Sequence, residues 1–311
     1  MKSVLRCSLK KVAHFILPQK AYRFFQRCIW RLRGELYEEK SFARKFITSR
    51  KHSAAVLPFR ISILCNVWNT PIPFLKQMTD SVLSQNCTEW ELLINNCSDE
   101  EHKHTEEFLE RFTHDPRVKI FRTVNQGICG NTHFLASNAS GEFIFLMDHD
   151  DFLLPDTLER LAAAQQKEKS DFVYADEFVL IMAEDHLLKN IKKPFTMTAL
   201  ERENFINHPA LIRKSLFEKS GGFRTGFEGS QDHDLYLRLC ENTSRITYVP
   251  ETLYVWRINN GSFSSLHPEI CIESGRKAVQ EHLERMNIQG KVVARDDLPI
   301  FTVVKNNTPF C

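Results

Sequence analysis

Three carboxylates stand within four consecutive positions of the sequence, in the segment Asp148-His149-Asp150-Asp151. Like charges at this spacing repel one another unless a cation neutralises them, and hard divalent cations prefer oxygen ligands. Mg²⁺ or Mn²⁺ held by one or two carboxylates keeps coordination positions open for phosphate oxygens. The alternative is a solvated acidic turn before a helix that begins near Pro155, with Asp151 or Asp156 as its N-cap.

A second group of charged side chains follows the pair Gly221-Gly222, in the segment Ser230-Gln231-Asp232-His233-Asp234. Ser230 is a favourable N-cap residue, so Asp232 and Asp234 fall in the first turn of the predicted helix. The helix dipole favours the ionised carboxylate there, which is the form a general base needs at neutral pH. Arg238 lies four residues after Asp234 and can pair with it. Asp232 keeps two interpretations, a general base or a simple partner of the helix dipole.

Short apolar runs that alternate with amphipathic stretches predict the elements that position these residues. From Arg60 the pattern is that of βαβ units, so we expect an α/β fold with a mostly parallel central sheet and flanking helices. The predicted strands are Ile61–Val67, Trp90–Ile94, Val118–Arg122, Glu142–Met147 and a strand from Phe172 that ends at Glu177, and the predicted helices are Phe74–Leu83, Asp99–Phe112 and Gly130–Ala139. Ligands bind beyond the carboxyl ends of such strands, so residues 66–70, 95–99 and 148–151 should converge on one crevice.

The distribution of charge sets the N-terminal segment apart. The 311 residues carry a formal net charge of +2, yet residues 1–34 are rich in Lys and Arg and contain no Asp or Glu. Residues 2–33 have the pattern of two short basic amphipathic helices broken at Pro18, and a charged helical connector is predicted over residues 35–58. The arm either packs on the body of the protein or lies on an anionic membrane surface. The remaining body is mildly acidic, which excludes a protein that grips nucleic acid over its whole surface.

The cysteines and the hydropathy indicate the compartment. The nine cysteines are scattered, odd in number and without the spacing of a zinc site, which favours a reducing compartment. No apolar run approaches the roughly 18 residues of a spanning helix, and the N-terminus does not have the pattern of a signal peptide. We therefore expect a cytoplasmic protein, held peripherally on the inner face of the cell membrane if the arm binds lipid.

Four motifs, taken in order, resemble family 2 glycosyltransferases of the GT-A fold, above all bacterial members that build O-antigens, capsules and other surface polysaccharides. They are Ile61-Ser62-Ile63-Leu64 with Trp68-Asn69-Thr70-Pro71, the acidic segment 148–151, Gly221-Gly222-Phe223 with Gln231-Asp232, and Tyr254-Val255-Trp256-Arg257. The resemblance implies a GT-A domain over residues 58–285. A basic helical extension and connector would precede it over residues 1–57, and a C-terminal tail would follow over residues 286–311.

The resemblance also implies an activity. An inverting, metal-dependent enzyme would transfer a single sugar from a nucleotide-sugar, with a UDP-sugar as the default donor, to a hydroxyl of a glycan or lipid-linked acceptor. Mn²⁺ or Mg²⁺ bound by Asp150 and Asp148 would neutralise the leaving nucleoside diphosphate, while Asp232 deprotonates the acceptor hydroxyl from the opposite face of the sugar. A single displacement of this kind needs no second carboxylate as a covalent nucleophile.

The remaining site residues follow from the same resemblance. The donor-binding residues would be Val67, Trp68, Asn69, Asn96, Asp148 and Asp150, and the acceptor-side residues would be Asp176, Glu177, Gln231 and His208. A salt-bridged strand edge is the alternative for Asp176 and Glu177, and a structural hydrogen bond is the alternative for His208.

Three positions depart from the family pattern. Asn95 and Asn96 stand where members usually carry an Asp pair, and Asn259 stands where many carry a histidine. An amide adds a hydrogen-bond donor and removes a charge, so these changes bear on nucleotide identity and on metal affinity. The second hypothesis is therefore a catalytically degenerate GT-A fold that binds nucleotide or glycan without turnover. A metal-dependent phosphoryl enzyme ranks last, because the sequence has no glycine-rich phosphate loop.

Overall fold

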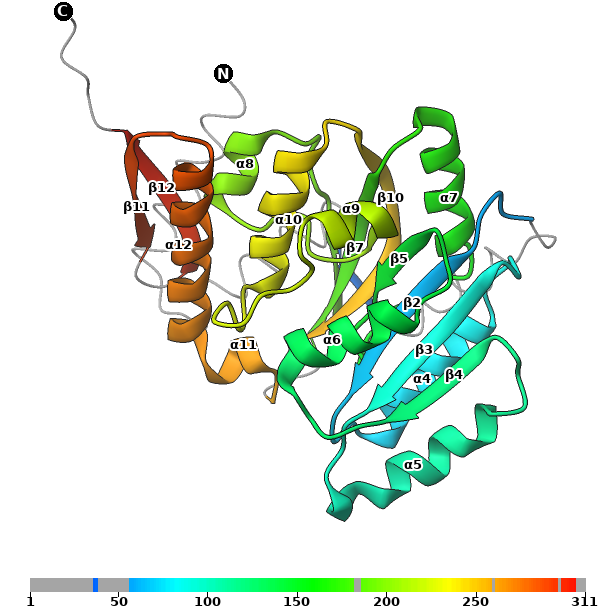
Figure 1. Cartoon of the computed structure of the whole chain (residues 1–311). Coiled ribbons are helices and arrows are strands. Elements are labelled where there is room, and N and C mark those ends of the chain that lie inside the picture. Colours follow the sequence, from blue (N-terminus) through cyan, green and yellow to red (C-terminus); the bar gives the residue numbers. More distant parts are fainter. Residues whose placement is uncertain (1–35, 39–55, 182–185, 259–260, 296–297, 306–311) are drawn as a thin grey trace, which may run out of the picture.

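The computed structural model describes residues 36–38, 56–181, 186–258, 261–295 and 298–305. The predicted amphipathic helices of the N-terminal arm, most of the predicted connector and Asn259 lie outside these residues. Figure 1 shows a central sheet with helices packed against it, and a small hairpin at the side of the last long helix.

Ten strands of the described residues form one mixed sheet. They are β1 (Leu36–Glu38), β2 (Ile61–Val67), β3 (Trp90–Asn96), β4 (Val118–Arg122), β5 (Phe143–Leu146), β6 (Phe152–Leu153), β7 (Phe172–Ile181), β8 (His186–Asn190), β9 (Ala210–Arg213) and β10 (Ile246–Ile258). The strands β5-β2-β3-β4 are parallel neighbours, as the alternation of apolar and amphipathic runs predicts. In the other part of the sheet β7 and β10 pair in parallel, while the described strands β9, β8, β6 and β1 make antiparallel ladders. The sheet is thus less parallel than predicted.

The helices lie between these strands and after them. They are α4 (Ile72–Leu83), α5 (Lys103–Leu109), α6 (Gly127–Asn138), α7 (Thr157–Glu168), α8 (Met197–Arg202), α9 (Lys214–Lys219), α10 (Gln231–Asn242), α11 (Phe263–Leu266) and α12 (Pro268–Arg285), with 3-10 turns η2 (Glu100–His102) and η3 (Glu110–Phe112) on either side of α5. The single helix predicted over residues 99–112 is therefore divided into three pieces, and α6 begins three residues before the predicted start.

Alternating side chains of β2 divide the core between the two faces of the sheet. Ile61, Ile63 and Cys65 pack with α4 in one apolar cluster, whereas Leu64 packs with α6 in the other. This period of two is what a strand buried on both faces requires. The acidic segment 148–151 follows β5, one of the parallel strands that these helices cover.

Two segments differ from the prediction, one in its length and the other in its type of secondary structure. β7 continues to Ile181 instead of ending at Glu177, because its apolar continuation pairs with β10. β1 occupies residues 36–38, where a helical connector was predicted.

The segment after α12, predicted as a tail, contains an antiparallel hairpin of β11 (Gly290–Arg295) and β12 (Leu298–Lys305). Phe301 of the hairpin is 2% exposed. It packs so closely on α12 that a Cβ at Gly275 would lie 2.6 Å from its ring. The domain boundaries predicted at residues 57 and 285 stay predictions, although α12 does end at Arg285.

Two findings concern the cysteines and the apolar character of the helices. The six cysteines within the described ranges are buried and free. In the same part of the chain, no helix combines the length and the apolar character needed to cross a bilayer.

Candidate active site

Asp151, the last carboxylate of the acidic segment, is fully buried and ties this segment to β10. It accepts hydrogen bonds from the Tyr254 hydroxyl at 2.8 Å and from the backbone N–H of Arg257 at 2.7 Å. Burial, followed by repulsion from Asp150 and Asp148, raises its pKa well above the usual range for aspartate. Asp151 therefore has a structural role here, and the ligand-binding roles of Asp148 and Asp150 stay predictions.

Arg257 fixes the same turn from the other side. It is 3% exposed, its guanidinium donates to the carbonyl oxygen of Asp150 and to Gln77, and it lies 4.2 Å from the centroid of the Phe74 ring. Burial and the neighbouring Asp148 raise the pKa of Asp150, while His149 and Arg257 oppose this shift. A carboxylate in such surroundings gains from a bound cation.

Asp148 faces His208, which enters from the loop before β9. The Nε2 atom of His208 lies 3.4 Å from Oδ2 of Asp148, and the imidazole stacks on Tyr254 with ring centroids 5.2 Å apart. Burial lowers the pKa of His208, but the attraction of Asp148 outweighs it and raises the value to about 10. In turn, burial raises the pKa of Asp148, and the facing imidazolium brings it below its usual value. The two side chains thus form an ion pair at neutral pH.

Asp232 lies in the first turn of α10, at the N-terminal end. Burial raises the pKa of Asp232 to about 6, with His208 lowering and Asp148 raising it. These couplings bring Asp148, His208 and Asp232 into one electrostatic cluster. A carboxylate with a pKa near 6 is ionised at pH 7 yet basic enough to accept a proton.

The neighbouring Gln231 and the cap residues complete this end of α10. The Oε1 atom of Gln231 is buried without a hydrogen-bond partner in the described part of the chain. Ser230 occupies the predicted N-cap position, but its hydroxyl donates to the carbonyl of Cys271 instead of capping the helix. Asp156 likewise precedes α7 without a capping bond from its side chain.

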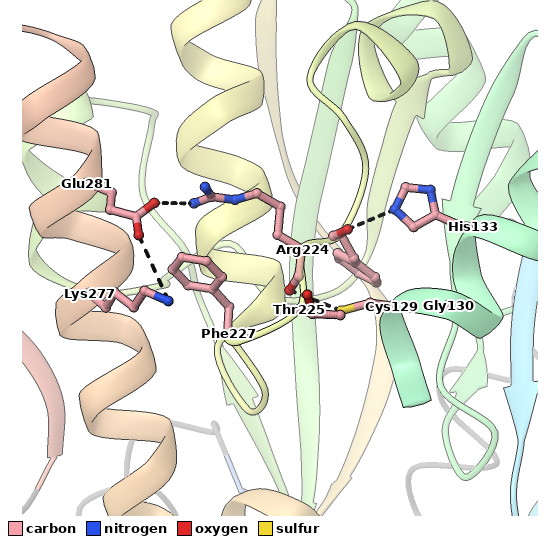
Figure 2. A pocket seen from close by; sticks show the side chains of 9 residues that line it. Cys129, Gly130, His133, Arg224, Thr225, Phe227, Lys277 and Glu281 are labelled. Atoms are coloured by element: carbon pink, nitrogen blue, oxygen red, sulfur yellow. Dashed lines mark hydrogen bonds and ion pairs between the residues drawn. The ribbon is translucent and has the colours of Figure 1, made fainter. Parts of the chain in front are cut away.

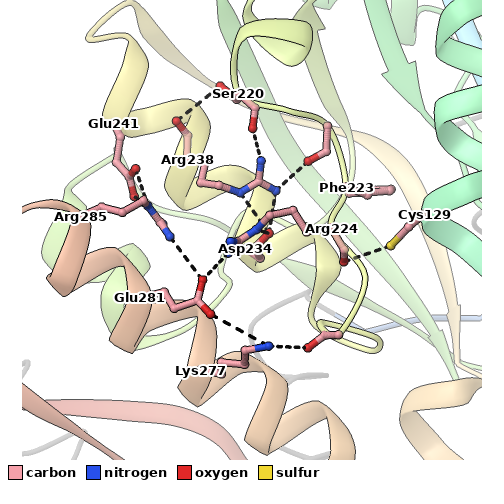
Figure 3. Close-up of polar contacts among 12 residues, drawn as sticks. Cys129, Ser220, Phe223, Arg224, Asp234, Arg238, Glu241, Lys277, Glu281 and Arg285 are labelled. Atoms are coloured by element: carbon pink, nitrogen blue, oxygen red, sulfur yellow. Dashed lines mark hydrogen bonds and ion pairs between the residues drawn. The ribbon is translucent and has the colours of Figure 1, made fainter.

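Asp234 anchors the turn that carries Asp232 (Figure 3). It is fully buried and receives hydrogen bonds from Arg224 and from Nη2 of Arg238, the latter at 2.6 Å. Burial raises the pKa of Asp234, but the two guanidinium groups lower it further than burial raises it. Arg238 also donates to the carbonyl of Gly222 at 2.7 Å. The predicted pair of Asp234 and Arg238 is therefore confirmed, and it joins α10 to the glycine turn before it.

A cavity of about 560 Å³ lies beside this network, between the first turns of α6, the loop 223–227 and α12 (Figure 2). Glu281 pairs with Arg224 at 2.8 Å and with Lys277 at 4.0 Å. The ring of Phe227, which is 2% exposed, lies beneath the cationic groups of Arg224 and Lys277. The charged groups of this cavity pair chiefly with one another, so its lining holds α12 against the loop.

The predicted donor-side segments converge at the ends of β2 and β3. Asn69 donates from its backbone to Ser98 at 3.0 Å and from its amide to Asp99 at 2.6 Å, and the Val67 carbonyl accepts from the N–H of Cys97 at 2.8 Å. These bonds join the first two of the three segments predicted to meet in one crevice.

The side chains at this edge differ in exposure. Trp68 is 53% exposed, so its indole is available to a ligand. Asn96 is 2% exposed, and its amide oxygen accepts from the N–H of Ser98 at 3.2 Å. The Nδ2 atom of Asn95 is buried without a hydrogen-bond partner among the described residues. The donor-binding roles of these residues stay predictions.

Asp176 and Glu177 lie in the middle of β7, behind the His208 loop. The Glu177 carboxylate is 3.4 Å from Nζ of Lys192, and Asp176 accepts from the backbone N–H of Lys192 at 2.8 Å and from the Tyr248 hydroxyl at 2.7 Å. The Lys192 ammonium also donates to the carbonyls of Ile206 and His208. The ion pair of the second interpretation is present, and an acceptor-side role for these two carboxylates stays a prediction.

Sequence reasoning missed the roles of Lys192 and Arg257. Arg257 is a single charge at the end of the apolar run Leu253 to Trp256, and a charge in that position signals a buried carboxylate partner. Lys192 stands in the pair Lys192-Lys193, which has the pattern of an exposed loop, so no comparable signal exists for it.

Comparison with solved structures shows the same fold in TarS of S. aureus. The structure of TarS residues 1–349 in complex with UDP-GlcNAc aligns with a TM-score of 0.60 at 18% identity, over 72% of this chain and 66% of that chain. The expected GT-A fold is thereby confirmed.

The family follows from the sequence. The model of glycosyl transferase family 2 matches residues 62–224, and the chain belongs to this family. It is 31% identical over 233 residues to an uncharacterised protein of Sinorhizobium fredii, covering 72% of this chain and 25% of that protein. It is 30% identical over 261 residues to the O-antigen biosynthesis protein RfbC of Myxococcus xanthus, covering 80% of this chain and 20% of that protein.

A shorter relative matches along most of its length. The putative colanic acid biosynthesis glycosyl transferase WcaA of Escherichia coli is 27% identical over 207 residues, which is 65% of this chain and 73% of WcaA. This chain therefore spans about a quarter and a fifth of the first two relatives and corresponds to most of the third.

Proposed function

We propose that this chain is an inverting glycosyltransferase that transfers one sugar from a nucleotide-sugar, by default a UDP-sugar, to a hydroxyl of a glycan or lipid-linked acceptor in bacterial surface polysaccharide biosynthesis. The observation that carries the proposal is the half-buried Asp232, whose pKa of about 6 suits a general base, next to the ion pair of Asp148 and His208. The similarity to the O-antigen biosynthesis protein RfbC and to the putative colanic acid glycosyl transferase WcaA supports the pathway, and the UDP-GlcNAc complex of TarS supports the donor class.

In this mechanism Asp232 takes the proton of the acceptor hydroxyl as the hydroxyl oxygen attacks the anomeric carbon. The bond from that carbon to the diphosphate oxygen breaks on the opposite face, so the anomeric configuration inverts. His208 carries a positive charge beside Asp148, and Asp234 with its two arginines holds the base in place. The site contributes to catalysis in two ways. It stabilises the charge of the leaving diphosphate, and it positions the group that accepts the proton.

A divalent cation is part of the proposal. Among the described residues no group of three or more His, Cys, Asp or Glu side chains is arranged to hold a metal ion. Asp150 and Asp148 would hold a magnesium or manganese ion of the kind that two carboxylates hold and substrate phosphates complete, because burial and the neighbouring Asp148 raise the pKa of Asp150 and a bound cation would offset that cost. When bound, the cation supplies Lewis-acid stabilisation of the leaving diphosphate.

The test is thermal unfolding of the wild type with UDP, dTDP, GDP and CMP, each with and without Mn²⁺. A ligand at a hundredfold its dissociation constant adds about 2.7 kcal/mol of apparent stability. We expect a metal-dependent shift with UDP that is lost in Asp150→Ala and kept in Asp80→Ala, an exposed carboxylate of α4. No shift with any nucleotide would contradict the proposal and favour the degenerate fold.

The stereochemistry has its own assay. Proton NMR of the freshly formed glycoside gives the anomeric coupling constant of the product, to be compared with that of the donor. We expect the opposite configuration. A product with the configuration of the donor would exclude the single displacement and require another nucleophile.

The basic arm completes the proposal as a contact to the membrane that carries a lipid-linked acceptor. Removal of residues 1–34 should reduce binding to anionic liposomes without lowering activity on a soluble acceptor. Unchanged liposome binding would favour the alternative in which the arm packs on the body of the protein.

A further inference from the structure

A second cavity, of about 290 Å³, lies between the segment after β8 and the loop that joins α8 to β9. Residues 190–193 line one side of it, and residues 203–205 together with Asn207 line the other. This volume is at the lower end for small-molecule sites, so the ligand that fills it is about as large as one sugar ring.

The lining offers hydrogen-bond donors and acceptors together. Asn190 uses its amide nitrogen on Glu177 at 2.8 Å, which leaves its amide oxygen for a ligand. Asn204 accepts from the N–H of Asn207 at 3.3 Å, which leaves its amide nitrogen. Amides with one free acceptor and one free donor suit the neighbouring hydroxyls of a sugar. The half-buried ring of Phe205 adds an apolar surface for the carbon side of a pyranose.

The charges around the cavity are balanced. Nζ of Lys193 lies 2.8 Å from Oε1 of Glu203 and 4.8 Å from the centroid of the Phe205 ring. The Lys192 ammonium is buried against Glu177, 3.4 Å away. A phosphate or a uronate is negatively charged, so it could pair with a lysine of the cavity only if that lysine gave up its glutamate partner. The balance therefore favours a neutral polyhydroxyl ligand.

The cavity and the active site share a wall. Asn207 lines the cavity, and the next residue is His208, which pairs with Asp148. The hydroxyl of Tyr236, one helical turn after Asp232 on α10, donates to the carbonyl of Asn207 at 2.8 Å. The Lys192 ammonium donates to the carbonyl of His208. The wall of the cavity therefore continues, one residue along the chain, into His208 of the cluster that contains the proposed base.

We propose that this cavity is the acceptor subsite and that it takes a neutral hexopyranose unit of the acceptor glycan. This inference rests on the proposed glycosyltransferase function and gives it a substrate class. It also assigns a task to Asp176 and Glu177, which hold the wall of the cavity through Lys192 and Asn190 without touching the sugar.

Saturation-transfer difference NMR on the full chain with UDP and Mn²⁺ tests the inference. The probes are the methyl glycosides of glucose, galactose and N-acetylglucosamine, with methyl glucuronide as the charged comparison. We expect a signal from at least one neutral glycoside that falls several-fold in Asn204→Ala and in Glu203→Gln. Lys277→Ala, in the larger cavity beside α12, should keep the signal. The absence of any signal from a neutral glycoside, an unchanged signal in both variants, or a stronger signal from the glucuronide would overturn the inference.

Kinetics separate this inference from the proposed function. Asn204→Ala should raise KM for the acceptor several-fold and leave KM for the donor and the nucleotide-induced thermal shift unchanged. A raised donor KM would place Asn204 in another site. A wild type without any nucleotide-induced shift would refute the proposed function, and the NMR experiment would still report whether the cavity binds a sugar.

Discussion

Replacing Asp232 by asparagine should stabilise the protein while it lowers the rate of transfer by about 10² to 10⁴. The pKa of this carboxyl is raised from 3.8 to about 6, chiefly by burial. Each pKa unit corresponds to about 1.36 kcal/mol, so the ionised carboxylate costs the folded state about 3 kcal/mol at pH 7. Asparagine has nearly the same shape and no charge. At this chain length a gain of that size raises Tm by roughly 5 °C.

The pH dependence gives the sign of this effect. Because the folded pKa lies above the unfolded one, the penalty is absent below about pH 4 and grows as pH rises to about 6. His208, with a pKa of about 10, keeps its charge throughout this interval. The difference in the free energy of unfolding between Asp232→Asn and the wild type should therefore be near zero at pH 4 and reach its full value by pH 7. Urea unfolding at several pH values measures it.

Asp234→Asn is the matched control, two residues along the same helix. Its pKa is lowered, because Arg224 and Arg238 outweigh its burial. The native pair contributes stability above pH 4 that is lost as pH falls through the folded pKa. Removing one partner of a buried ion pair costs roughly 3 to 5 kcal/mol, so this variant should be less stable at pH 7.

Two results would refute the reasoning. If Asp232→Asn is no more stable than the wild type at pH 7, or if its advantage does not change between pH 4 and pH 7, the carboxylate is not desolvated and its raised pKa has no physical basis. Transfer should fall by about 10² to 10⁴ with unchanged nucleotide binding. Transfer near the wild-type rate in this variant would remove Asp232 from the role of base.

Three further changes test other parts of the structure. His208→Gln removes a cation that lowers the pKa of Asp232, so the acidic limb of the pH-rate profile should move to higher pH; a limb that stays in place would contradict the coupling. Gly229→Ala should lower stability by about 1 to 3 kcal/mol in urea unfolding, since φ is +78° and the new Cβ would meet the Cys271 sulfur at 2.4 Å. Gly226→Ala, with φ of +83° but only the flexible Lys277 nearby, should lose less, and equal losses would count against the steric account. Phe301→Ala should cost about 3 to 5 kcal/mol and leave nucleotide binding intact, whereas Val293→Ala, which is 49% exposed, should change little; a Phe301 variant as stable as the wild type would show that the hairpin does not support α12.

The sequence predicts the parallel part of the sheet well because that part is built from local signals. The bounds of β2 and β4 agree with the prediction, since each is an apolar run bounded by turn residues. β10 was not predicted as a strand. It contains Pro250 and register shifts against β7, and its partner lies far back in the chain. The hydrophobic pattern of either segment does not indicate a pairing between strands so far apart in the sequence.

The candidate site likewise combines residues that local sequence signals predict with contacts between distant segments that they do not predict. Residue type and spacing single out Asp148, Asp150 and Asp232 as candidates, because clustered carboxylates after a strand and a carboxylate in a first helical turn fit a cation site and a general base, and these roles stay predictions. The structural role of Asp151 could not be predicted from the sequence. Its hydrogen-bond donors, the Tyr254 hydroxyl and the Arg257 backbone N–H, come close to it only in the folded chain. The proximity of His208 to Asp148 likewise depends on the antiparallel pairing of β9 with β5.

The division of the sheet has a consequence for how the chain acquires activity during folding. Strands β2 to β5 follow one another along the chain, whereas β7 pairs with β10 at Phe172 and Ile246. Contacts between distant segments form later, because the chain entropy of closing a long loop must be overcome first. Asp148 follows the early part, and Asp232 belongs to the late part. Recovered transfer activity in a refolding experiment therefore reports completion of the entire sheet, and a folding intermediate that contains only the β2 to β5 layer is catalytically silent.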